Sequence, residues 1–144
     1  MHIIQDLINQ ARAHQWPYPK LFEELKKQNV ISYSVSFADN RGYEALYITP
    51  TETVKEETPQ GYKETTAKES FDEDKIKEAI IDNAQKKIIY VEFLSRIADA
   101  GVTHYTVNMP ERLVMYYNKD ESKSYQQKVP FFSEDNSAVK NQSA

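Results

Sequence analysis

The feature that most constrains this chain is a similarity between two of its own segments, which lie 72 positions apart. Residues 21–37 and 93–109 align without a gap, and each reads as an amphipathic helix, a stop and an alternating strand. Asn29 and Gly101 occupy the stop, and both residue types tolerate the left-handed conformation that closes a helix. The match predicts that one structural unit occurs twice.

Apolar residues at helical spacing occur twice before the first strand. The first helix is predicted from an apolar stripe at positions 4, 7, 8 and 11, and the proline of Trp16-Pro17 ends it. A second helix is predicted from the stripe at positions 21, 22 and 25. In the second half, a capping pattern predicts a third helix that begins near Asp72, and a fourth helix stops at Gly101. Four helices are therefore expected.

Strands follow each helix pair, because the apolar period changes there to two. In the first half, residues 31–37 and 43–49 form a predicted hairpin, and Gly61–Ala67 could add one exposed edge strand. The charged run Glu52–Glu57 is interpreted as a solvated loop rather than an acid/base pair. The second half is expected to contribute three strands, over residues 102–109, 112–117 and 123–129.

These elements predict an α+β fold. Strands joined by tight turns pair antiparallel. The economical assembly is a mainly antiparallel sheet of five to six strands with four helices on one face. The repeat of helix, helix, strand, strand and an optional third strand would be related by a pseudo-two-fold axis. One domain is expected over residues 1–132, with halves of approximately 1–67 and 70–130, and residues 133–144 are expected to be a disordered tail.

The composition excludes several classes of protein. The chain has no cysteine, which rules out disulfides, thiolate metal sites and cysteine nucleophiles. A net charge of -4 and a pI near 5.4 oppose the basic patch that is typical of nucleic-acid binding. The first residues lack the regions of a signal peptide, and no apolar run approaches the roughly 20 residues that cross a bilayer. We expect a cytoplasmic protein without a nucleic-acid or membrane partner.

The second half also resembles a known family. Its segments YVEFLSRIADAGV, HYTVNM and LVMYYNKDESKSYQQKVP are similar to a small uncharacterised bacterial family whose members are often labelled "phage envelope protein". The shared features are a Tyr-x-x-Phe helix start, a junction, a Tyr-rich hairpin and a closing strand: Tyr90 and Phe93, Ala100-Gly101-Val102, Tyr116-Tyr117 and Val129-Pro130. The first-half segment PYPKLFEELKKQNVISYSV fits the family's N-terminal pattern, so the resemblance covers roughly residues 15–130.

The resemblance implies no established activity. Family members often carry a tryptophan where this chain has Tyr105, and a cysteine in the preceding helix that this chain lacks. That departure argues against thiol chemistry. The label itself raises the hypothesis of a phage virion component.

The candidate binding residues are polar side chains on the outward face of the two matched strands. The 72-residue shift aligns two short rows: Ser32, Ser34 and Ser36 with His104, Thr106 and Asn108. A pseudo-two-fold axis would bring both rows onto one sheet surface, where hydroxyls around an imidazole could line a pocket or a partner interface. Tyr116 joins them because tyrosines cluster on the predicted hairpins and suit partly wet surfaces. The competing interpretation is that half-exposed strands carry polar residues for solubility.

Motifs of catalysis are missing from the sequence. It has no Gly-rich phosphate loop, no G-x-S-x-G, no H-E-x-x-H and no run of His, Asp and Glu at ligand spacing. A general base would have to be His104, whose sequence neighbours offer neither a nucleophile nor a carboxylate to orient it. No catalytic residue, metal ligand or cofactor is therefore predicted.

The sequence favours a non-catalytic binding module, prophage-associated or regulatory, that acts through the exposed sheet face. Its expected partner is a second copy in a homodimer or another protein. The alternative is a small-ligand binder or a small enzyme centred on His104, and a virion component is the second alternative. A flat open sheet face favours the module, whereas an enclosed pocket of about 300 Å³ or more around His104 favours the alternative.

Overall fold

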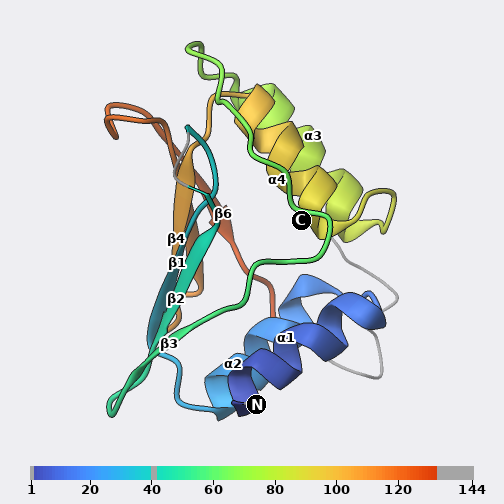
Figure 1. Cartoon of the computed structure of the whole chain (residues 1–144), viewed down its shortest axis with the longest axis vertical. Helices are drawn as coiled ribbons and strands as arrows, with labels where there is room; N and C mark the ends of the chain where they lie inside the picture. The colour runs from blue at the N-terminus through green and yellow to red at the C-terminus, as the bar shows by residue number, and fades with distance from the viewer. Residues whose placement is uncertain (1, 40–41, 133–144) are drawn as a thin grey trace.

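The computed structural model describes residues 2–39 and 42–132 and folds them into two layers (Figure 1). A six-stranded antiparallel sheet forms one layer, and the four helices of the described residues lie on one face of it. The predicted α+β class is confirmed. The internal duplication stays a prediction, and the predicted tail, residues 133–144, lies outside the described residues.

The first half supplies two helices and three strands: α1 (Ile3–Ala13), α2 (Tyr18–Lys27), β1 (Ser32–Ser36), β2 (Glu44–Ile48) and β3 (Thr53–Lys55). Helix α1 is capped by His2, whose side chain accepts a hydrogen bond from the backbone N–H of Ile4. Helix α2 follows Pro17, whose fixed φ suits the start of a helix. The chain leaves α2 at Asn29, which has a φ of 65°.

The second half supplies two helices and three strands: α3 (Glu73–Ala84), α4 (Tyr90–Asp99), β4 (His104–Asn108), β5 (Leu113–Tyr117) and β6 (Ser124–Lys128). The side chain of Asp72 caps α3, as the capping pattern predicts. Helix α4 ends at Gly101, which has a φ of 99°. A Cβ at this position would lie 2.4 Å from the carbonyl oxygen of Ser70, so this close approach requires glycine.

The strands of the two halves meet at the centre of the sheet. Their order is β3-β2-β1-β4-β5-β6, and β1 pairs with β4 so that Ser34 lies opposite Thr106. Alternate residues of each strand point toward the helices and away from them. Strands β1 and β4 therefore each direct one row of side chains into the core and another row to the face that no helix covers.

The predicted edge strand at Gly61–Ala67 is wrong. Within the described residues, β3 forms this edge of the sheet and pairs Val54 with Tyr47, while Thr65 makes a single parallel bridge to Ala38. A tight turn explains the difference, because the backbone N–H of Thr49 donates to the carbonyl oxygen of Glu52 and returns the chain directly alongside β2. Three residues with one buried apolar side chain suffice for a strand when the turn fixes the register.

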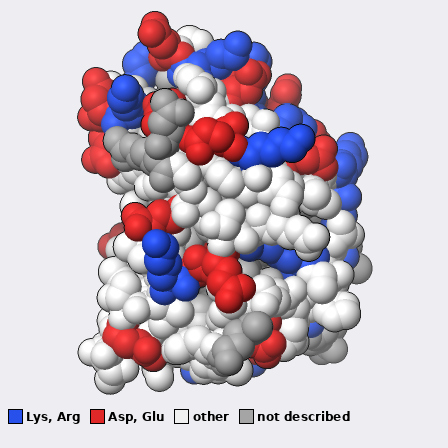
Figure 2. All heavy atoms as spheres, viewed as in Figure 1, with Lys and Arg blue, Asp and Glu red and all other residues white. Residues whose placement is uncertain are grey.

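The core lies between the helices and the inner face of the sheet. Its largest fully buried side chains include Phe22, Leu25, Ile76, Leu94 and Ile97 from the helices. The segment after β3 passes between the pair α1–α2 and the pair α3–α4 before it reaches α3 (Figure 1). Charged side chains crowd the end of the molecule that holds α3 and α4 (Figure 2). Among the described residues, no helix combines the length and the apolar character needed to cross a membrane.

Candidate functional site

The structure brings the two polar rows of the central strands together on the face that the helices leave uncovered. Three cross-strand pairs form the rows: Ser32 opposite Asn108, Ser34 opposite Thr106 and Ser36 opposite His104. Directly opposed residues share a face of the sheet and lie close enough for their side chains to touch. Six of the seven candidate residues therefore share one surface.

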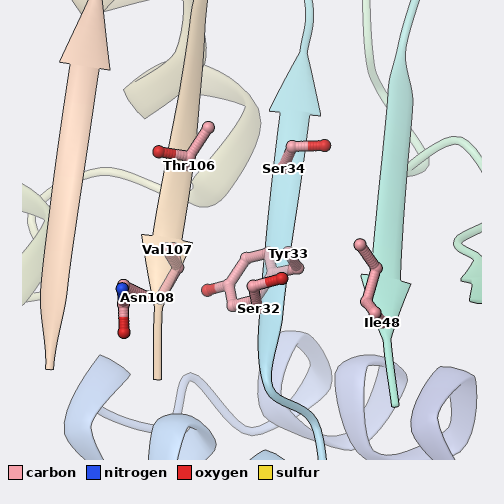
Figure 3. A pocket seen from close by; sticks show the side chains of 7 residues that line it. All are labelled: Ser32, Tyr33, Ser34, Ile48, Thr106, Val107 and Asn108. Carbon is pink, nitrogen blue, oxygen red and sulfur yellow. The ribbon is translucent and has the colours of Figure 1, made fainter. Parts of the chain in front are cut away.

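A shallow open hollow of about 250 Å³ lies over four of these residues. Ser32, Ser34, Thr106 and Asn108 line it together with Ile48 of β2 (Figure 3). Their side chains rise from three neighbouring strands, and the ring of Tyr33 lies behind the sheet plane in this view. The hollow exists because serine and threonine are shorter than the side chains of the strands on either side.

Apolar side chains flank the polar rows on both sides. The strand next to β1 directs Leu46 and Ile48 outward, and the strand next to β4 directs Leu113, Met115 and Tyr117 outward. We call the surface between them the outer groove: its floor is the outward residues of β1 and β4, and its walls are these five side chains. The apolar walls suit apolar side chains of a partner, whereas the polar floor requires uncharged hydrogen-bonding groups opposite it.

Charge is almost missing from the outer groove. Of the twelve side chains that β1, β2, β4 and β5 direct outward, Glu44 alone carries a formal charge. In the whole chain, 28% of residues are charged. A solvent-facing sheet surface with so few charges differs from an ordinary solubilising face and has the charge depletion that is typical of interface centres.

His104 lies at one end of the floor, outside the hollow, and its ring is held on both sides. Its Nδ1 is 2.7 Å from the hydroxyl of Thr103 and its Nε2 is 2.6 Å from Glu121. The ring also stacks on Tyr117, with 5.3 Å between centroids. The sequence neighbours of His104 offer no carboxylate to orient it, but the β5–β6 turn carries Glu121, 17 positions away, back over β4.

A hydroxyl, an imidazole and a carboxylate meet at this end of the floor. The hydroxyl is hidden from the surface, because Thr103 is 2% exposed. Within the described residues, no three His, Cys, Asp or Glu side chains are arranged to hold a metal ion.

Tyr116 lies on the opposite face from the other candidates. It is 4% exposed, packs beneath the helices, and donates a hydrogen bond of 2.7 Å to Gln127. The alternation of β5 accounts for this, because Met115 and Tyr117 point outward on either side of it. Tyr116 is part of the core and is not available to the surface on which the polar rows lie.

A buried carboxylate was missed by the sequence reasoning. Glu56, placed in a solvated loop, is 3% exposed and accepts hydrogen bonds from the hydroxyls of Tyr43 at 3.0 Å and Tyr47 at 2.8 Å. Arg12 of α1 pairs with the same carboxylate at 2.6 Å. The guanidinium of Arg12 also lies 4.1 Å from the centre of the Tyr90 ring. The group fastens α1, α4 and the sheet to one another.

Tyrosine pairs extend this network on both sides. The hydroxyls of Tyr18 and Tyr33 are hydrogen-bonded at 2.5 Å, and those of Tyr90 and Tyr105 at 2.8 Å. The second pair follows the first by 72 positions, because Tyr90 corresponds to Tyr18 and Tyr105 to Tyr33. Burial is the main cause that raises the pKa of Tyr33, Tyr90 and Tyr105 well above the ordinary value. These hydroxyls stay neutral and act as hydrogen-bonding groups of the core. The abundance of tyrosine was the signal in the sequence, but it did not identify Glu56 as the acceptor for Tyr43 and Tyr47.

Comparison with known proteins gives one family and no activity. The family described as "Protein of unknown function (DUF1398)" matches residues 5–128. No curated protein matches the chain.

Proposed function

Because the chain belongs to the DUF1398 family of proteins of unknown function, we propose its role from geometry. It is a non-catalytic interaction module, and the outer groove binds a protein partner. The single observation that carries this proposal is the scarcity of charge on this face: among the twelve outward side chains of β1, β2, β4 and β5, Glu44 alone carries a formal charge. A chain that is 28% charged has ample polar residues to cover a purely solvated face.

The geometry gives less support to a small enzyme or small-ligand binder centred on His104. That side chain lies outside the hollow, and the hollow is open rather than enclosed. Ligand sites usually bury most of the ligand in a cavity of about 300–1,000 Å³. A prophage or virion role rests on the resemblance alone, and it would be dismissed by particles that lack the protein and a gene that lies away from prophage genes.

The test compares proteins captured by the full chain and by two arginine variants. Ser34→Arg places a long charged side chain on the groove floor. Gln85→Arg adds the same charge at an exposed position at the end of α3 and serves as the control. Partners captured by the wild type and the control should be lost from the Ser34→Arg variant by tenfold or more. Equal capture by all three chains would refute the role of the groove.

A second copy of the chain is the other expected partner. Light scattering during size exclusion, over a wide range of protein concentration, measures this directly. A dimer that Ser34→Arg dissociates would identify the second copy as the partner. A monomer at every concentration would remove it and leave another protein.

A further inference from the structure

Building on the proposed function, we infer that the outer groove seats a single amphipathic α-helix of a partner protein. The width of the groove carries this inference. The backbones of β2 and β5, which carry its walls, are three strand spacings apart, or about 14 Å. A helix with its side chains is about 10–12 Å across, so a helix that lies over the floor brings its side chains to both walls. An extended strand occupies one spacing of about 4.8 Å and would reach only one wall.

The floor lets a helix approach closely. Ser34 and Thr106 face each other at its centre, and their short side chains leave the hollow of about 250 Å³ open to the outside. The outward residues of each strand span four rises, or about 13 Å, which corresponds to roughly nine helical residues. Two to three turns with an apolar stripe at positions i, i+3, i+4 and i+7 would therefore cover the groove.

The charge distribution specifies the inner face of that helix. Glu44 lies at the end of the groove, is 54% exposed and is paired with Lys55, so the centre of the groove offers no ionic partner. A charged side chain pressed onto the floor would lose water without gaining a counter-ion. The bound face is therefore uncharged, with small residues over the floor and branched aliphatic residues against Ile48 and Leu113.

Two other occupants fit this surface less well. A second copy would lay an identical outward face, with the same polar floor, over this one. Two concave faces would also leave both hollows unfilled, against the close packing of interface cores. The chain's own residues 133–144, SEDNSAVKNQSA, carry Val139 as their one apolar side chain larger than alanine and so lack the required stripe.

The experiment selects peptides from two displayed libraries against the full chain. Both libraries contain 14-residue peptides of the same composition, with apolar residues at helical spacing in one and at every second position in the other. Recovered peptides are then measured against the wild type, Ser34→Arg, Ile48→Asp and the control Gln85→Arg. Ile48 is 43% exposed, so its substitution tests a wall without disturbing the core if the floor variant does not fold.

We expect binders from the helical library that gain helical circular dichroism when bound. They should lose tenfold or more in affinity with Ser34→Arg and Ile48→Asp but keep it with Gln85→Arg. Groove-dependent binders from the alternating library alone would overturn the helix and leave the interaction module intact. A dimer that the groove variants dissociate, and that no recovered peptide displaces, would also overturn the helix and leave the interaction module intact. A monomer with no groove-dependent binder from either library would overturn both the helix and the proposed function.

Discussion

Replacing Arg12 by methionine tests whether the buried ion pair fastens α1 to the sheet. The side chain of Glu56 is fully buried, and the guanidinium of Arg12 lies 2.6 Å from it with 27% of its side chain exposed. Methionine keeps the aliphatic packing against Tyr90 and removes the charge. Removing one partner of a buried pair costs about 3–5 kcal/mol, because the other charge stays buried without compensation. The partial exposure of Arg12 places the expected loss near ~3 kcal/mol.

Urea unfolding at neutral pH measures this loss, and thermal unfolding should show a fall in Tm of about 6–12 °C for a chain of this size. Arg96→Met is the matched control, because it breaks an ion pair to Asp82 at 3.0 Å whose side chains are 39% and 29% exposed. Exposed pairs are worth about 0–1 kcal/mol. If both variants lose the same stability, the reasoning about Glu56 is refuted.

A double variant separates the charge from the packing. Arg12→Met with Glu56→Gln leaves no buried charge, and the glutamine oxygen can still accept from the hydroxyls of Tyr43 and Tyr47. Its stability should return to within about 1–2 kcal/mol of the wild type, with a favourable coupling between the two substitutions. Simple addition of the two single losses would contradict an ion-pair origin.

Two further predictions concern the buried tyrosines and the glycine that ends α4. Burial raises the pKa of five tyrosines well above the ordinary value of about 10: Tyr33, Tyr47, Tyr90, Tyr105 and Tyr116. Their contribution to stability is complete below about pH 10 and falls as pH rises further, by about 1.4 kcal/mol per unit for each tyrosine, because the unfolded chain ionises first. The tyrosinate absorbance of these five rings should therefore appear together with cooperative unfolding, and ionisation of all five in a folded chain would contradict this. Gly101→Ala should cost about 2–5 kcal/mol in chemical unfolding, because the added Cβ would meet the Ser70 carbonyl oxygen and the residue has a φ of 99°. Gly42→Ala is the control and should cost only about 1 kcal/mol, because the space around Gly42 is open. Equal losses in the two variants would remove the steric argument.

Local chemistry made the helices and most strands predictable from the sequence. The helical apolar stripe ends at Asn29 and at Gly101, and both residues have the positive φ that the sequence pattern requires. The period of two then assigns Tyr33 and Tyr105 to the core and Ser34 and Thr106 to the outside. These assignments depend on nearby residues alone.

Long-range contacts could not be read from the sequence. Glu56 lies in a polar run, and its burial depends on Arg12, which is 44 positions away on another element. The partner of His104 is Glu121, 17 positions away across two strands and a turn. In each case the sequence shows a charged residue in polar surroundings, and only the assembled fold supplies the opposite group.

Under the proposed function, stability and binding belong to opposite faces of the sheet. The inner face is held by buried aromatic rings and by the hydrogen bonds from Tyr43 and Tyr47 to Glu56, whereas the outer groove supports no helix of the described chain. Ser34 is half-buried by its neighbours rather than by a covering layer, so a longer side chain there can extend into solvent. Ser34→Arg should therefore change the free energy of unfolding by less than about 1 kcal/mol while it abolishes binding. A chain that unfolds on this substitution would show that the outer groove, like the inner face, belongs to the structural core.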